Sequence, residues 1–532
     1  MDRLRTLGPP GRVNRVPDCP APPSADAKKA IGRKIALSSF FNLVNFFVSV
    51  PVMILLVPFL LHRLGEKSYG VWCMSNTLLG LIGLLYFGFA PAVMKYVAEH
   101  EARGEHERLN RVAATCVACF LVVSLLVTAV VETLGPWLAV RLFGPSLDSA
   151  SPNPGVAVLR ITLLVFWLKY PFAAFALVLS GLQRQDLVQM VNIGNTLGFA
   201  AGAVFVLERG GGVVELLWWS AGMAALCQLA FVLLAHRLCP RLSLRPWLAD
   251  RASFLCVYRF GMKLFTTSFA VSVHETFDKF VLSWRLMRTD LVGLYDIAAN
   301  LLDKAQAIPA NTMGPLLAAA SELSARGDYD SLAGLYRRAQ RYNTVLATLF
   351  FGGVFVVGRP LFTVWLRSAN PFILDVSYVL VAGLYARALY LPAAHLLNGL
   401  GHPEATMEAC LIGGAANLGL GLLFLSFLGP IGLAAGTSVS LVLEMACILR
   451  RFSKTVPSGK LSSLLPDVPA TLIAFGLSAI LATPIAEPAS RLHPWPLLTG
   501  GCLYVAVYLA VLVALRVVGR QDLVIFRALL CR

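Results

Sequence analysis

Charged and polar side chains recur at helical spacing inside an apolar segment near the middle of this chain. Over residues 260–282, one face of a helix carries the following residues at spacings of four, three and four: Ser268, Ser272, Glu275 and Lys279. Glu275 and Lys279 form an i, i+4 pair in the favourable order. His274 and Asp278 lie beside this face. The pattern predicts a polar stripe on one helix, with a structural ion pair between Glu275 and Lys279 as the alternative.

The next apolar segment, residues 292–318, carries a second stripe. Asp296, Asn300 and Asp303 follow one another at spacings of four and three, and Lys304 adjoins Asp303 but points further round the helix. Two successive helices with such stripes are poorly suited to face lipid. We therefore expect them to line a hydrated cavity, where ionisable groups inside a membrane usually lie.

Other polar residues fall within apolar segments as well. Residues 36–61 carry a milder stripe in which amides replace charges: Ser38, Asn42, Asn45 and Ser49. Lys169 and Arg387 lie deep within two further segments. The candidate cavity cations are therefore Lys169, Lys279, Lys304 and Arg387. Cys116 and Cys119 form a C-x-x-C in an apolar segment with no histidine nearby, which favours packing over a metal site.

The composition indicates a membrane protein, so these residues are positioned by membrane-spanning helices. The chain has 532 residues, of which 57% are hydrophobic and only 14% are charged, whereas soluble domains carry about 25% charged residues. Segments of about 20 mostly apolar residues are long enough to cross a bilayer as helices. Fourteen such spans are predicted, at 36–61, 70–96, 112–132, 157–180, 188–207, 214–235, 260–282, 292–318, 344–357, 377–399, 409–427, 430–449, 467–485 and 495–515. The fold class is therefore an all-α polytopic membrane protein.

Lysine and arginine set the orientation of the spans, because they accumulate on the cytoplasmic side. With the N-terminus inside, the inner segments hold 29 of these residues and the outer loops hold 9. Both termini are therefore predicted to be cytoplasmic, and residues 1–35 are predicted to be a disordered basic tail. The longest outer loop is predicted at 133–156.

A short segment recurs 223 positions later, which predicts a duplication. Residues 98–109 align without gaps on residues 321–332, with five identical pairs out of twelve. The first copy follows span 2 and the second follows span 8, so both face the cytoplasm and the halves are parallel repeats. The predicted organisation is a six-helix bundle at 36–235, a basic cytoplasmic linker at 236–259, a second six-helix bundle at 260–450, and two extra helices with a cytoplasmic tail at 451–532. Convergence of two amphipathic loops is the alternative.

Two groups of residues, taken in order, resemble a known family. The first group is Leu64-Gly65, Tyr69-Gly70-Val71-Trp72, Gly88 and Lys95-Tyr96-Val97-Ala98. The second is Asp278-Lys279-Phe280-Val281-Leu282, Val292-Gly293-Leu294-Tyr295, Ala298, and the Ala-Arg-Gly-Asp loop that leads to Arg341-Tyr342. Their order and spacing, over most of residues 36–450, resemble Wzx-like polysaccharide flippases, whose superfamily also contains MATE drug exporters and lipid II flippases.

The resemblance implies a V-shaped pair of six-helix bundles plus two C-terminal helices. It also implies movement of a polyprenyl-diphosphate-linked oligosaccharide from the inner to the outer leaflet of a bacterial cytoplasmic membrane. The diphosphate would need cations, and the four cations named above are the candidates, with Asn42, Asn45 and Asn300 beside them. Glu275, Asp278, Asp296 and Asp303 would hold these cations in place or exchange H⁺ or Na⁺.

Other functions are compared with this one. A MATE-type exporter of drugs or metabolites is the main alternative. A glycosyltransferase or polymerase is disfavoured because the outer loops are short and hold few acidic residues. No phosphate-binding loop is present, so direct use of ATP is not expected. We expect no cofactor, no metal and no nucleic-acid partner; the expected partners are the lipid-linked oligosaccharide, membrane lipid, and a polysaccharide polymerase and glycosyltransferases.

Overall fold

The computed structural model describes residues 25–84, 89–144, 154–367, 370–456, 465–488 and 493–517. The regular elements within these ranges are helices, as expected where backbone groups must be satisfied within one segment. Helix α1 (Ala25–Gly83) contains two helical stretches joined at Gly65, whose φ of +75° is readily adopted only by glycine. It covers predicted span 1 and residues 70–83 of predicted span 2, whose last residues belong to the next helix. It also includes residues 25–35, which were predicted to be disordered; residues 1–24 of that tail lie outside the described residues.

The first half continues with six further helices. They are α2 (Phe89–Ala102), α3 (His106–Phe143), α4 (Pro154–Lys169), α5 (Ala173–Gly181), α6 (Gln185–Glu208) and α7 (Val213–Leu238). Helices α4 and α5 together form predicted span 4, which is interrupted around Pro171. The outer loop predicted from residue 133 was placed too early, because α3 continues to Phe143, where Leu142 and Phe143 are buried.

The second half begins within the predicted linker. A short 3₁₀ turn, η2 (Pro246–Leu248), precedes α8, and the Asp250 side chain caps α8 by accepting a hydrogen bond from the Ser253 amide. The helices that follow are α8 (Arg251–Leu286), α9 (Thr289–Thr312), α10 (Gly314–Arg326), α11 (Tyr329–Leu366), α12 (Pro371–Gly399), α13 (Pro403–Leu428) and α14 (Ile431–Thr455). A final pair, α15 (Val468–Ala486) and α16 (Trp495–Ala514), packs against α11 through Tyr504 and Tyr508.

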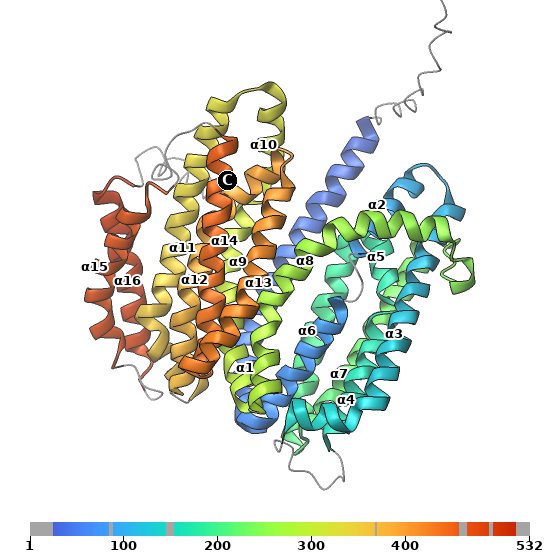
Figure 1. The fold of residues 1–532 in the computed structure, drawn as a ribbon, viewed down its shortest axis with the longest axis horizontal. Helices are drawn as coiled ribbons and strands as arrows, with labels where there is room; N and C mark the ends of the chain where they lie inside the picture. Colours follow the sequence, from blue (N-terminus) through green and yellow to red (C-terminus); the bar gives the residue numbers. More distant parts are fainter. Residues whose placement is uncertain are drawn as a thin grey trace, which may run out of the picture.

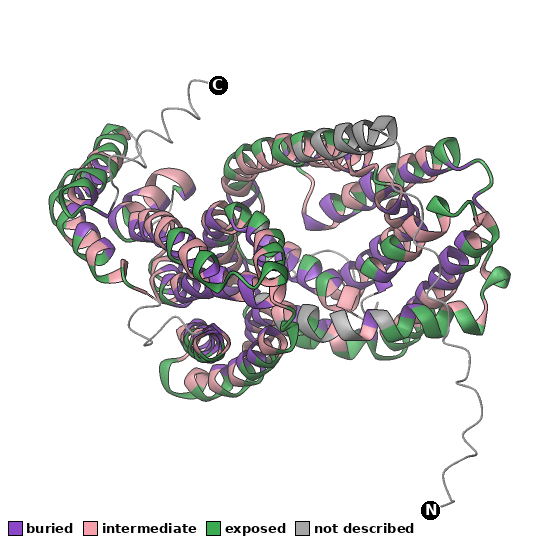
Figure 2. Cartoon of the chain, turned by 90° about the horizontal axis from the view of Figure 1, so that it is seen from above, coloured by how far each residue is buried: buried purple, intermediate pink, exposed green. Residues whose placement is uncertain are grey.

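Among the described residues, eleven helices are long and apolar enough to cross a membrane, so the predicted number of fourteen is not confirmed. The difference has two origins. Helix α1 contains predicted span 1 and part of predicted span 2 in one element, and α8 and α9, which carry several charged residues each, are not among the eleven. Large apolar side chains are exposed on peripheral helices, among them Leu126, Phe427 and Ile480. Figure 2 shows exposed residues along the outer faces of both helix groups, as expected for lipid-facing surfaces.

The two copies of the recurring segment adopt the same backbone turn. Gly104 and Gly327 have φ angles of +69° and +70°. The amide of each glycine donates to the carbonyl three residues earlier, over 3.0 Å in both copies, and the amides of Glu105 and Asp328 donate five residues back. Leu109 and Leu332 are both buried after the turn. The two copies of the recurring segment therefore match in local backbone structure as well as in sequence.

The two halves meet at one end of the molecule and diverge toward the other, which gives the expected V shape (Figure 1). They meet near the bend of α1 and the turn between α8 and α9. A Cβ atom on Gly70 would lie 1.7 Å from the carbonyl oxygen of Thr289, and one on Gly293 would lie 3.1 Å from the Cα of Gly70. Gly293 is the 223-residue counterpart of Gly70, so the helices cross where each half has a glycine. The largest buried apolar cluster, which includes Tyr69 and Leu294, surrounds this crossing.

Candidate functional site

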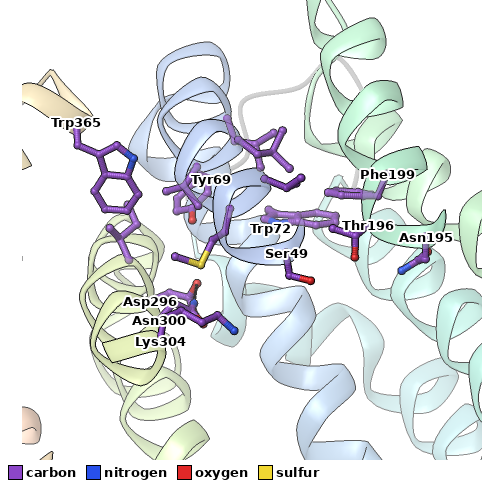
Figure 3. A pocket seen from close by; sticks show the side chains of 16 residues that line it. Ser49, Tyr69, Trp72, Asn195, Thr196, Phe199, Asp296, Asn300, Lys304 and Trp365 are labelled. Carbon is purple, nitrogen blue, oxygen red and sulfur yellow. Dashed lines mark hydrogen bonds between the residues drawn. The ribbon is translucent and has the colours of Figure 1, made fainter. Parts of the chain in front are cut away.

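A cavity of about 370 Å³ lies between the halves. Helices α1 and α6 of the first half line it on one side, and α9 and α11 of the second half line it on the other. Figure 3 shows Asp296, Asn300 and Lys304 on α9, across from Trp72, Thr196 and Phe199. The cavity therefore has a charged wall and an aromatic wall.

The charged wall follows from the spacing of residues on α9. Asp296, Asn300 and Lys304 are four positions apart and all line the cavity. The Nδ2 of Asn300 donates to Asp296 over 2.7 Å, and the Nζ of Lys279 on α8 donates to the other oxygen of Asp296 over 2.9 Å. The Lys279 and Asp296 side chains are only 14% and 16% exposed. Asp296 therefore neutralises Lys279, while Lys304 forms no ion pair with any described residue and remains available to an anion.

The wall from the first half is aromatic and uncharged. The rings of Trp72 and Phe199 stack with centroids 5.2 Å apart, and Ser49, Asn195 and Thr196 line the cavity near them. Ser49 donates to Asn45 over 3.3 Å, and Asn45 donates to Gln189 over 3.0 Å. This part of the span-1 stripe therefore joins α1 to α6. Asn42, two turns before Ser49, is exposed and does not line the cavity.

Lys169 lies on the first half at the end of α4, just before the break at Pro171. It is close to the Cys227 thiol, which contacts Asn195 over 3.4 Å, and Asn195 lines the cavity. Lys169 forms no ion pair with a carboxylate among the described residues. It is thus a second cation of the cavity region, contributed by the opposite half.

A second polar cluster lies inside the second half, between α8, α12, α13 and α14. The Nε2 of His274 contacts Glu444 over 2.9 Å, and the Tyr390 hydroxyl donates to the other Glu444 oxygen over 2.6 Å. Asp278 accepts hydrogen bonds from Tyr295 and from Thr437, the latter over 2.6 Å. All six of these side chains are buried.

Two oxygen atoms of this cluster lack a hydrogen-bond donor among the described residues. They are Oδ1 of Asp278 and Oδ1 of Asn417, both buried. The Nδ2 of Asn417 donates to Thr437 over 2.6 Å, so the amide and the carboxylate share one hydroxyl neighbour. Buried acceptors of this kind are costly unless something fills the site. A proton on Asp278, or a small cation that prefers oxygen ligands, would satisfy them.

The remaining predicted residues fall in other places. Asp303 was predicted to share a face with Asp296, but it is exposed and does not line the cavity, whereas Lys304, predicted to point further round the helix, does line it. Arg387 on α12 is close to Tyr390 and Cys410, which places it beside the buried cluster and not among the residues that line the cavity. The Glu275 side chain lies outside the described residues. Lys279, which the alternative interpretation paired with Glu275, forms an ion pair with Asp296.

Glu444, Asn417 and Thr437 were not identified from the sequence. Glu444 is the only acidic residue of predicted span 12, so the rule that selected Asp278 would have selected it as well. Asn417 and Thr437 are neutral residues of ordinary type, and only the packing of α13 and α14 against α8 reveals them. The two polar sites connect through α8, because Asp278 belongs to the buried cluster and its neighbour Lys279 pairs with Asp296 in the cavity wall.

Comparison with known proteins places this arrangement in a family. Residues 32–363 match the family described as polysaccharide biosynthesis protein. The chain belongs to this family. It is also 21% identical over 522 residues to the "Uncharacterized membrane protein EpsK" of Bacillus subtilis (strain 168), covering 92% of this chain and 96% of that protein.

Solved structures show the same fold at low sequence identity. The lipid II flippase MurJ in an inward closed conformation superposes with a TM-score of 0.66 at 12% identity, covering 90% of this chain and 98% of MurJ. An inward-facing multidrug resistance MATE family transporter of the MOP superfamily gives 0.62 at 13% identity, covering 80% and 96%. The protein is therefore an integral, multi-pass membrane protein with the fold of MOP-superfamily transporters and flippases.

Proposed function

We propose that this protein moves a polyprenyl-diphosphate-linked oligosaccharide across a bacterial cytoplasmic membrane for surface polysaccharide assembly. The observation that carries the proposal is Lys304, a cation without an ion-pair partner among the described residues, in a cavity between the two halves. Membership of the polysaccharide biosynthesis protein family supports the choice of substrate class.

The cavity suits the head of such a lipid. A lysine ammonium binds phosphate as a point charge, and Lys304 lies opposite an aromatic pair and amide groups that suit a polar ring system. Asp296 holds Lys279 in place at one edge, so the geometry of this neutral pair is fixed before the substrate enters. Lys169 adds positive charge from the first half. The cavity volume of about 370 Å³ is within the usual range of ligand sites, about 300–1,000 Å³.

Transport by alternating access requires the contact between the halves to break and reform. In this structure the halves are packed together at the crossing of Gly70 and Gly293 and diverge toward the end that carries the two repeated loops. With those loops on the cytoplasmic side, as the charge distribution predicts, the cavity would accept substrate from the inner leaflet. Both termini are then cytoplasmic. Glycosyltransferases would build the substrate before this step, and a polymerase would act on it afterwards.

The buried cluster supplies a means of coupling this movement to an ion. Protonation of Asp278, or a cation bound between Asp278 and Asn417, would change the net charge around Asp278 on α8. Because Lys279 is the next residue on α8, a shift of this helix would move its ion pair with Asp296. We propose that H⁺ or Na⁺ binding at Asp278 is linked to the cavity in this way.

Reconstituted protein tests the substrate assignment. Vesicles would contain a fluorescent polyprenyl-diphosphate-linked saccharide, and its appearance in the opposite leaflet would be followed with a membrane-impermeant quencher. Loss of one charge-assisted contact, worth about 1.5–3 kcal/mol, should make Lys304→Gln slower by about 10- to 100-fold at limiting substrate. Lys67→Gln, an exposed lysine outside the cavity, should transport normally. Equal rates in both variants would contradict the assignment.

A MATE-type exporter of drugs or metabolites remains the alternative, because the fold is shared with such transporters. The same vesicles separate the two functions. An exporter would accumulate cationic dyes against an ion gradient and leave the lipid-linked saccharide in its original leaflet. The proposed flippase would move the saccharide to the opposite leaflet and would not accumulate the dyes.

A further inference from the structure

The first copy of the repeated turn lies against the end of α7 and brings three metal-binding side chains together. They are Glu101 near the end of α2, His106 at the start of α3, and Cys239, which follows α7 directly. Their ligand atoms all lie within 4.8 Å of one another. Residues from three separate elements therefore converge on one point, far from the cavity and from the buried cluster.

The distances are close to those of a metal centre. The Nδ1 of His106 and the Oε2 of Glu101 are 3.7 Å apart. Two ligands on a tetrahedral Zn²⁺, each at about 2.0–2.2 Å, are separated by about 3.4 Å. A small rotation of the exposed Glu101 side chain would bring its carboxylate to that spacing from His106. An adjoining cavity of about 300 Å³, lined by Glu101 and Leu238, provides a path for entry.

One ligand atom is left without a partner in the present arrangement. The Nδ1 of His106 is buried and has no hydrogen bond among the described residues. Its distance to Glu101 is too long for a hydrogen bond. Cys239 is a free thiol that is 6% exposed. This buried imidazole nitrogen has no hydrogen-bond partner in the described part of the chain, and a thiol and a carboxylate lie next to it. A metal ion bound to all three would satisfy the nitrogen.

The second copy of the turn shows that these residues are not needed for its fold. Positions 101 and 106 correspond to Ser324 and Tyr329. The backbone nevertheless has the same φ at the central glycine and the same hydrogen bonds. The ligand set is therefore an addition to the first copy, and the turn forms equally well without it.

We propose that Glu101, His106 and Cys239 form a binding site for one divalent metal ion of the Zn²⁺ class. A thiolate, a carboxylate and a neutral imidazole balance the charge of such an ion and leave a fourth position for water. The bound ion would fasten the α2–α3 turn to the point where the chain leaves α7 for the second half. Asn110 already holds the following segment there, through hydrogen bonds of 2.9 and 3.0 Å with the backbone of Arg241 and Ser243.

Cobalt spectroscopy on the full-length protein tests the site. The protein would be purified in nanodiscs, stripped with a chelator and titrated with Co²⁺. We expect about one tightly bound ion per chain, with tetrahedral visible bands and a sulfur-to-cobalt charge-transfer band in the near ultraviolet. Zn²⁺ should displace the Co²⁺ and abolish both sets of bands.

Three variants locate the ligands. Cys239→Ser should remove the charge-transfer band, and His106→Tyr and Glu101→Ser, which introduce the residues of the second copy, should weaken Co²⁺ binding at least tenfold without unfolding the protein. Cys256→Ser, at an exposed thiol on α8, is the matched control and should bind normally. Absence of the charge-transfer band in the native chain, or its survival in Cys239→Ser, would show that the cluster is an ion pair between Glu101 and His106 and not a metal site. The result does not depend on the proposed transport function.

Discussion

The two halves of this protein share a scaffold but differ in where they carry charge. Both contain the same loop, with matching glycine angles and a buried leucine after it, and both contribute a glycine to the central crossing. In the second half, α8 and α9 carry Asp278, Lys279 and Asp296, whereas the stripe on α1 consists of amides and hydroxyls. The comparison indicates that the halves share their packing while the charged sites lie mainly in the second half.

The largest effect should come from the cavity ion pair of the second half. Lys279→Gln leaves Asp296 partly buried without its cation, which costs up to about 3–5 kcal/mol for a fully buried pair. We expect transport to be abolished and stability to fall, as measured in vesicles and by thermal unfolding. The double variant Lys279→Gln/Asp296→Asn should recover stability but not transport.

The exposed pair of the first half, Arg63–Glu208, is the control for this experiment. These side chains are 43% and 51% exposed, so Arg63→Gln should cost about 0–1 kcal/mol and leave transport intact. If Arg63→Gln were as damaging as Lys279→Gln, the charge asymmetry between the halves would have no functional meaning.

Buried aspartates in the two halves should also behave differently. Asp278 has an unpaired oxygen, whereas Asp186 at the start of α6 pairs with Arg184 at 3.0 Å. Asp278→Asn should make the transport rate insensitive to the imposed H⁺ or Na⁺ gradient, because the exchangeable charge is gone. Asp186→Asn should lower stability and keep the gradient dependence. Transport by Asp278→Asn that still follows either gradient would exclude this residue from coupling.

A steric change at the crossing tests whether the two glycines are equivalent. Gly70→Ala places a methyl group 1.7 Å from the Thr289 carbonyl oxygen, whereas the nearest backbone atom to a methyl group at Gly293 is 3.1 Å away. We expect Gly70→Ala to destabilise the protein by about 1–3 kcal/mol and Gly293→Ala by less, as measured by thermal unfolding. Gly135→Ala, where nothing lies within 4 Å, should be harmless. The reverse order for the two crossing glycines would show that the crossing relaxes asymmetrically.

The smallest difference is expected between the two repeated loops. Leu109 and Leu332 are 1% and 0% exposed, so replacing either with alanine should cost about 2–5 kcal/mol. Chemical denaturation of the two variants should give values that agree within about 1 kcal/mol. A much larger loss in one of them would mean that the halves no longer share an equivalent core.

Features that depend on one helix or one repeated segment could be predicted from the sequence. The face shared by Asp296 and Asn300 follows from helical spacing, although the prediction placed Asp303 on that face where the structure has Lys304. The matching turns at Gly104 and Gly327 follow from the repeat. Features that depend on packing between helices could not. Nothing in the spacing selects Asp296 over Glu275 as the partner of Lys279, and nothing marks Asn417 as a neighbour of Asp278.

The contact between Gly70 and Gly293 has a consequence for the origin of the protein. Residues in equivalent positions that meet across a central axis have the geometry of an isologous homodimer, in which one surface binds its own copy. In such a dimer a single glycine would serve both sides, and any substitution would appear twice. In a single chain each side of the contact can change separately, so the two halves are arranged as the subunits of a heterodimer joined covalently.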